Sequence, residues 1–159
     1  MNGPSTRYAR RMETKNPAFR ELVEDVFARA GFVRELGIEL VDVGVGWCET
    51  RLEVGPRHLQ QNGVVHAGVH STLADHTAGA AAASLVGPDE YVLTVEFQVH
   101  LLRAAPPAPL HCRADVLKPG ARFSVVEASV YSDRGDRREL VSKLTATVAV
   151  LGQGAGQRS

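Results

Sequence analysis

One long segment, residues 67–85, limits the folds open to this 159-residue chain because it carries almost no charge. The pattern predicts a helix over residues 66–86, ending at Gly87-Pro88, with small or apolar residues on all of its sides. This pattern is typical of a helix that is buried on every side. Asp75 lies within it, and a buried carboxylate costs free energy unless it has partners or a task. Asp75 is therefore the first candidate functional residue.

The apolar residues on both sides of this segment recur with a period of two, which predicts strands. Six strands are expected, over residues 38–45, 47–54, 91–102, 110–117, 123–132 and 140–151. Glycine- and proline-bearing turns separate them, and strands joined in this way favour an antiparallel sheet. Because a single apolar helix needs something to cover it, an α+β fold with a curved sheet around the helix is predicted.

A further helix is expected ahead of the strands, from residue 17 to residue 30. Asn16 can cap its first amides, Pro17 fits a first helical turn, and apolar residues follow at three- and four-residue spacing. Residues 1–15 are polar and expected to be flexible, and residues 152–159 read as a disordered tail. One domain is thus predicted over residues 16–151, a length that can bury a core.

The composition disfavours several classes of partner and compartment. Lys plus Arg and Asp plus Glu are both 18, so no basic surface for nucleic acid or an anionic membrane is implied. Two distant cysteines, Cys48 and Cys112, argue against a disulfide scaffold and a cysteine zinc site. No signal peptide or membrane-spanning apolar run is recognised, so a cytoplasmic location is expected.

The residues leading into the long helix form a distinctive pattern. They read Gln60-Gln61-Asn62-Gly63-Val64-Val65-His66-Ala67-Gly68, and Asp75 follows nine positions after His66. This pattern resembles the hotdog-fold acyl-CoA thioesterases of the phenylacetate-pathway and 4-hydroxybenzoyl-CoA type. Similar segments of that family fall at residues 32–37, 94–103 and 118–122, so the resemblance covers about residues 30–151. It implies a hotdog fold, here with an extra N-terminal helix.

The chain departs from that pattern at one position. Many members have His-Gly-Gly where this chain has His66-Ala67-Gly68. An alanine keeps its backbone amide, so the chemistry expected of that amide survives, although the close approach of a ligand is slightly hindered.

The resemblance implies hydrolysis of an acyl-CoA thioester to a free acid and CoA. Asp75 would be the general base or nucleophile, and the Ala67 amide would polarise the carbonyl from the positive end of the helix. Gln60 would donate to the same carbonyl or position water, and Thr94 would contact the water or the carboxylate. His66 is expected to cap or orient the loop.

Each of these residues also has a structural alternative. Asp75 could form a hydrogen bond at a helix contact, and loop residues could cap the amides near Ala67. Gln60 could be a solvated loop residue, in which case Asn62 could take its role as the donor to the carbonyl. Thr94 could be an ordinary strand threonine. A proton-transfer role for His66 stays open as well.

The spacing of these residues bears on the oligomeric state. Nine positions along a helix correspond to about 13.5 Å of rise, so Asp75 cannot easily serve the beginning of its own helix. Relatives pair two long helices in antiparallel fashion, and each site takes its amide from one subunit and its carboxylate from the other. The resemblance therefore implies a homodimer or a homotetramer.

The phosphates of CoA predict cations near the pocket mouth. Arg103, Lys118 and Arg122 are candidates, with Asn62 and Gly68 as further substrate contacts, although each could be a solvated surface residue. No cofactor is expected, since CoA is part of the substrate. No metal is expected either, because Ala67 stands where a His-Glu-x-x-His motif has its glutamate.

Two other functions remain open at this point. A non-catalytic acyl-CoA-binding hotdog protein would keep the fold and the pocket, and a hotdog hydratase or dehydratase would use a histidine and a carboxylate in different motifs. The residues do not indicate which acyl group is bound.

Overall fold

The computed structural model describes residues 12–152, so most of the segment expected to be flexible and nearly all of the expected tail lie outside the described residues. The elements are α1 (Phe19–Arg29), α2 (Gly31–Leu36), β1 (Ile38–Gly44), β2 (Trp47–Leu52), the short 3₁₀ helix η1 (Pro56–His58), α3 (Ala67–Ala83), β3 (Glu90–Leu101), β4 (Leu110–Lys118), β5 (Phe123–Arg134) and β6 (Arg137–Gly152). Gly152, expected to begin the tail, is instead the last residue of β6.

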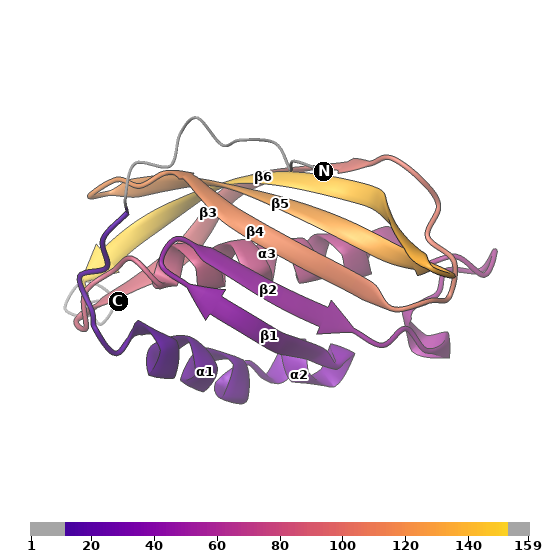
Figure 1. Ribbon diagram of the computed structural model, residues 1–159, viewed down its shortest axis with the longest axis horizontal. Coiled ribbons are helices and arrows are strands. Elements are labelled where there is room, and N and C mark those ends of the chain that lie inside the picture. The colour runs from indigo at the N-terminus through magenta and orange to yellow at the C-terminus, as the bar shows by residue number, and fades with distance from the viewer. Residues whose placement is uncertain (1–11, 153–159) are drawn as a thin grey trace, which may run out of the picture.

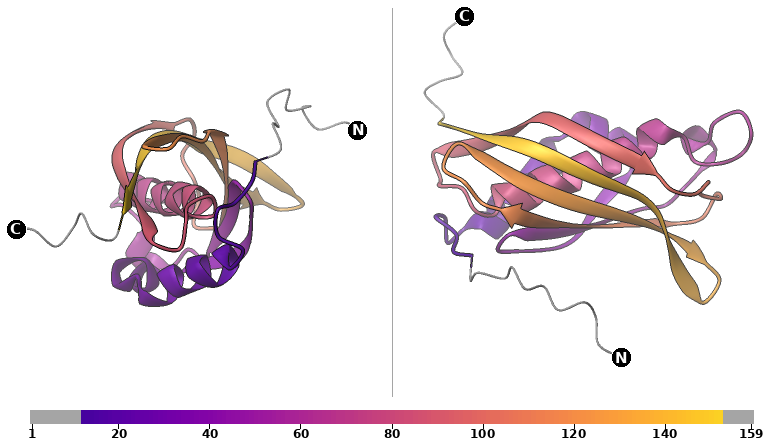
Figure 2. Two further views of the ribbon diagram at one scale, coloured as in Figure 1. Left: turned by 90° about the vertical axis from the view of Figure 1, so that its left-hand side faces the viewer. Right: turned by 90° about the horizontal axis from the view of Figure 1, so that it is seen from above.

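The six strands form one antiparallel sheet in the order β1-β2-β4-β5-β6-β3. Figure 1 shows β4, β5 and β6 crossing diagonally over α3. The end-on view in Figure 2 shows the sheet curving around α3, with α1 and α2 on the side that the sheet leaves open. The predicted α+β hotdog fold with an additional N-terminal helix is confirmed.

The small residues of α3 allow the curved sheet to approach the helix closely. Leu73, Ala74, Ala78 and Ala81 have no exposed surface and contact the inner face of the sheet as part of the core. One buried polar contact joins the two layers, because Thr77 Oγ1 on α3 lies 2.6 Å from Thr50 Oγ1 on β2. These hydroxyl groups therefore satisfy each other away from water.

The first helix begins two residues later than expected. Asn16 Oδ1 accepts a hydrogen bond from the Ala18 amide at 3.0 Å, so Asn16 caps the turn that leads into α1, whereas the N-cap of α1 itself is Ala18. Pro17 and Ala18 form a turn, and α1 begins at Phe19. Val23 and Phe27 of α1 are buried in the core, so this helix covers the open side of the sheet.

One face of α3 is incompletely covered, contrary to the expectation of burial on every side. Gly68, Thr72, Asp75 and Gly79 follow one another at helical spacing, and each keeps exposed surface. An added Cβ at Gly79 would meet no atom within 4 Å. The sheet and α1 therefore leave a stripe of small residues on α3 open in the single chain, which we call the α3 stripe.

The edge strand β3 also exposes apolar side chains. Leu93, Val95 and Phe97 are 53%, 57% and 42% exposed, and β3 pairs with β6 on one side only. Unpaired backbone groups on such an edge are a template for adding a further strand. Within residues 12–152, no helix combines the length and the apolarity needed to cross a membrane.

Candidate active site

The beginning of α3 is organised by His66. This residue has extended backbone angles at the N-cap position, and its Nδ1 accepts a hydrogen bond from the Gly68 amide at 2.9 Å. The prediction that His66 caps the helix is confirmed. Its ring nitrogen satisfies one of the amides that a helix beginning leaves unpaired.

The Ala67 amide differs from its neighbour. It forms no hydrogen bond within the described part of the chain, and Ala67 is exposed. A free amide at the positive end of a helix can bind a carbonyl oxygen and the oxyanion that develops from it. The Ala67 amide, which the sequence suggested as a donor to the thioester carbonyl, is thus available for that role.

Gln60 is oriented by the tight turn ahead of α3. The turn closes through hydrogen bonds from the Gly63 amide to the Gln60 carbonyl at 3.0 Å and from the Gln60 amide to the Val64 carbonyl at 2.9 Å. Gly63 allows this turn because its φ is +78°. The side-chain Oε1 of Gln60 accepts a hydrogen bond from the Asn62 amide at 2.9 Å, and the donating end of the Gln60 side chain has no partner among residues 12–152.

Gln60 and Ala67 line the same cavity of about 370 Å³, which we call the amide cavity. Another wall consists of residues 101–105, at the end of β3 and in the connection to β4, and includes Arg103. His70, one turn into α3, completes the helix side of this cavity. The structure thus brings two of the predicted catalytic residues and one predicted cation together.

Asp75 lies in a different cavity of about 480 Å³, the carboxylate cavity, which Thr94 of β3 also lines. The Asp75 Oδ1 atom is buried and has no hydrogen-bond partner among the described residues. A buried carboxylate oxygen without a partner is costly and calls for a ligand, a proton or another chain. The two cavities share no lining residue, so one chain does not assemble all the predicted catalytic residues.

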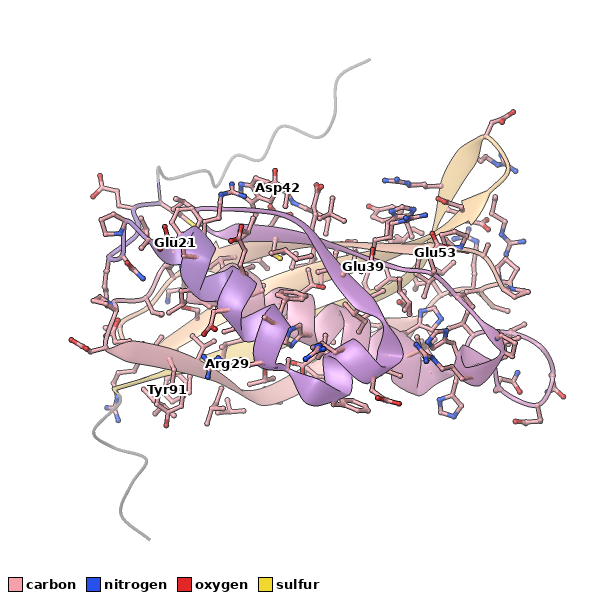
Figure 3. The ribbon with its side chains drawn as sticks, turned by 90° about the horizontal axis from the view of Figure 1, so that it is seen from below. Glu21, Arg29, Glu39, Asp42, Glu53 and Tyr91 are labelled. Atoms are coloured by element: carbon pink, nitrogen blue, oxygen red, sulfur yellow. The ribbon has the colours of Figure 1, made fainter. Side chains whose placement is uncertain are left out.

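The carboxylate cavity has mainly apolar walls, which come from α1, α3 and β3. Figure 3 shows Arg29 of α1 and Tyr91 of β3 on the same side of the molecule, and both line this cavity. Sequence reasoning did not select either of them, because α1 is remote from Asp75 in the sequence. The sequence indicated only that α1 is amphipathic, and therefore that one of its faces packs against the rest of the protein.

His76 adjoins Asp75 and also lines the carboxylate cavity. Its ring packs edge-on against Phe27 of α1, with 4.5 Å between the ring centroids, and its Nε2 is buried without a partner in the described part of the chain. Burial lowers the pKa of His76, partly opposed by the charge of Asp75. Burial therefore disfavours the protonated form of this imidazole.

The three predicted CoA-binding cations do not converge in one chain. Arg103 lines the amide cavity and forms an ion pair with Glu139 at 3.3 Å. Lys118 ends β4 and Arg122 precedes β5, at the turn between these strands, and neither lines the amide cavity. Within residues 12–152, no group of three or more His, Cys, Asp or Glu side chains is placed to hold a metal ion.

Comparison with known proteins bears on this arrangement. Residues 62–138 match the thioesterase superfamily. A 1,4-dihydroxy-2-naphthoyl-CoA hydrolase of Listeria monocytogenes is 30% identical over 118 residues, which are 74% of this chain and 95% of that protein. The chain belongs to the thioesterase superfamily. This thioesterase is thus a thioester hydrolase, and the family suggested by the residues around His66 is confirmed.

Solved structures agree with this thioesterase over most of its length. A thioesterase family protein from Silicibacter pomeroyi has 34% identity and a TM-score of 0.82, covering 84% of this chain and 98% of that one. A thioesterase from Haemophilus influenzae is similar in fold, with 22% identity and a TM-score of 0.80, covering 92% of this chain and 100% of that one.

Proposed function

We propose that this thioesterase hydrolyses acyl-CoA as a homodimer, with each active site formed by the amide cavity of one subunit and the carboxylate cavity of the other. The observation that carries this proposal is the separation of the predicted catalytic groups. Ala67 and Gln60 line one cavity, Asp75 and Thr94 line another, and no residue lines both. An antiparallel arrangement of two copies of α3 would place each amide cavity beside the partner's carboxylate cavity.

Two surfaces of the single chain support this assembly. The β3 edge exposes Leu93, Val95 and Phe97, and the α3 stripe has small residues that permit close helix approach. A two-fold axis that pairs β3 with its copy would extend the sheet and cover both surfaces at once. The same contact would enclose the unpartnered Oδ1 of Asp75.

In the proposed reaction the thioester carbonyl accepts hydrogen bonds from the Ala67 amide and the side-chain amide of Gln60. The partner's Asp75 takes a proton from a water molecule as the water oxygen attacks the carbonyl carbon. The C–S bond then breaks, the electron pair leaves with sulfur, the CoA thiolate takes up the proton from Asp75, and the acid is released. His66 contributes by holding the beginning of α3, and Thr94, which lines the same cavity as Asp75, would orient the water.

The substrate would be divided between the two cavities. The carboxylate cavity, with apolar walls from α1 and β3, would receive the acyl group, and a volume of about 480 Å³ can hold a bicyclic aromatic group. The Listeria relative, a 1,4-dihydroxy-2-naphthoyl-CoA hydrolase, makes aromatic acyl groups the first to test. Arg103 would meet the CoA phosphates at the amide cavity.

The test is thiol release from aromatic and aliphatic acyl-CoAs by the wild-type protein and by Asp75→Asn. Loss of a general base or nucleophile should lower kcat by about a hundredfold or more. Thr50→Val is a suitable control, because Thr50 is buried in the core and lines neither cavity. Wild-type protein that binds acyl-CoA without cleaving any of them would favour a binding protein and contradict the proposal.

A further inference from the structure

The amide cavity contains a polar group that the proposed reaction has not used. His70 is 2% exposed, lines this cavity, and lies three residues after Ala67 on the same side of α3. Residues at this spacing on a helix lie about 5–6 Å apart at their Cβ atoms. The imidazole is therefore within one side-chain length of the free Ala67 amide.

One nitrogen of this ring is fixed by a buried hydroxyl. His70 Nδ1 lies 3.0 Å from Ser142 Oγ on β6, and Ser142 has no exposed surface. Among the described residues, His70 Nδ1 is the only partner of this hydroxyl, and Nε2 of His70 has none. Because His70 lines the amide cavity and its Nδ1 is taken by Ser142, Nε2 is the ring nitrogen left for a ligand there.

The hydroxyl of Ser142 decides which nitrogen carries the proton. If Nδ1–H donated to Ser142 Oγ, the hydroxyl proton would be buried with no acceptor among the described residues, which is unfavourable. If Ser142 donates to Nδ1, both groups are satisfied and the ring proton is on Nε2. Burial also lowers the pKa of His70, so the ring is neutral near pH 7 and this tautomer is well defined.

We propose that His70 is a third hydrogen-bond donor of the oxyanion site, with Nε2–H directed at the thioester oxygen beside the Ala67 amide and Gln60. The inference rests on the proposed function and adds a residue to it. A tetrahedral oxyanion has room for three donors, and a neutral imidazole held by Ser142 is a donor already in place before the charge develops. His70 keeps its proton throughout, so it lowers the barrier by hydrogen bonding alone.

Three variants separate this role from a structural one. His70→Leu removes the donor, and His70→Gln retains an amide N–H. Ser142→Ala removes the hydroxyl that fixes the tautomer while leaving the imidazole in place. Loss of one oxyanion donor should lower kcat of His70→Leu by about a hundredfold with little change in KM. His70→Gln should recover at least about a tenth of the wild-type kcat, and Ser142→Ala should fall between the two.

The matched control is again Thr50→Val, which removes a buried hydroxyl that bonds to α3 at Thr77, away from both cavities. It should lower the thermal midpoint and leave kcat unchanged. The inference is overturned if folded His70→Leu behaves like this control. If no acyl-CoA is hydrolysed by wild type, or if Asp75→Asn is fully active, the proposed function itself fails. Loss of activity in Asp75→Asn together with an active His70→Leu overturns only the role of His70.

A second measurement needs no variant of His70. Nitrogen NMR of the ¹⁵N-histidine-labelled wild-type protein should show His70 as the Nε2–H tautomer. That proton should shift when a dethia acyl-CoA analogue, with CH2 in place of sulfur and its carbonyl retained, is bound. Free CoA lacks the carbonyl and should produce no comparable shift. A ring protonated on Nδ1, or one that does not respond to the analogue, would contradict the assignment.

Discussion

Cys48 on β2 and Cys112 on β4 both direct their thiols into the core, where they are 0% and 2% exposed. Burial raises the pKa of each thiol to about 12. Because the thiolate is the reactive form, neither cysteine should react with Ellman's reagent at pH 8 in the folded protein. Denaturation should expose both thiols of each chain. Reaction in the native state would show that the core opens between these strands, and it would also disturb the thiol-release assay.

His76 gives the stability of the protein a defined pH dependence. Its pKa in the folded protein is lowered by burial, so the unfolded chain binds a proton that the folded chain resists. The free energy of unfolding should therefore decrease as the pH falls below about 6.5, the ordinary histidine value. Urea denaturation at pH 7.5, 6.5 and 5.5 measures this change.

The control for His76 is His76→Phe, which keeps an aromatic ring against Phe27 and cannot titrate. Its stability should depend less on pH over the same range than that of the wild type. Equal slopes for the two proteins would show that His76 has the same pKa in the folded and the unfolded chain, contrary to its buried position.

Single residues differ in how far the sequence alone can predict them. His66 could be identified as a cap because its bond to the Gly68 amide spans two residues and depends only on local geometry. The unpartnered Oδ1 of Asp75 and the neighbouring Phe27–His76 contact depend on how α1 packs against α3. No local pattern contains that information.

At the scale of elements, the α3 stripe leads to a prediction about assembly. Gly79→Leu should be tolerated by the single chain, since no atom lies within 4 Å of the added Cβ. On the proposed dimer it would separate the two helices, so analytical ultracentrifugation should show a smaller species with a native circular dichroism spectrum. Gly31→Leu, on α2 and likewise in open space, is the control and should remain dimeric. A Gly79→Leu protein that dimerises normally would place the interface elsewhere.

The sequence predicted all six strands and the long helix, but it misplaced several ends. The hairpin of β5 and β6 was expected to open at residues 132 and 140, whereas the ladder continues to Arg134 and Arg137. The residues at this tip are mostly charged, a composition that is typical of a loop. In the structure they pair across strands, as Arg138 does with Asp133 and Arg134 with Glu139, and Gly135 closes the turn with φ at +62°.

For the whole molecule, the proposed dimer can be tested by complementation. Asp75→Asn damages the carboxylate half-site and Gln60→Ala the amide half-site, so each homodimer should have low activity. Random exchange of subunits would give half heterodimers, each with one intact and one doubly altered site, and activity should return to about a quarter of wild type. No recovery after proven subunit exchange would show that each site lies within one chain.

The proposed division of the site between two chains could not be derived from the residues alone. Helix rise separates Asp75 from Ala67, but only the resemblance suggested that a second chain supplies the missing half. The structure adds that the two groups line separate cavities and that β3 and α3 have uncovered surfaces. Such information depends on the sheet order and on burial, which are properties of the packed molecule.

The separation of the two cavities has a consequence for the rate that a given amount of this protein can sustain. When each site needs two chains, a chain by itself has no turnover, and dilution below the dissociation constant makes total activity fall with the square of chain concentration. Synthesis of more protein in a cell then raises both the number of chains and the fraction of them that are in active dimers. Output becomes steeply sensitive to abundance in that range, and acyl-CoA that bridges two subunits would itself favour the active form.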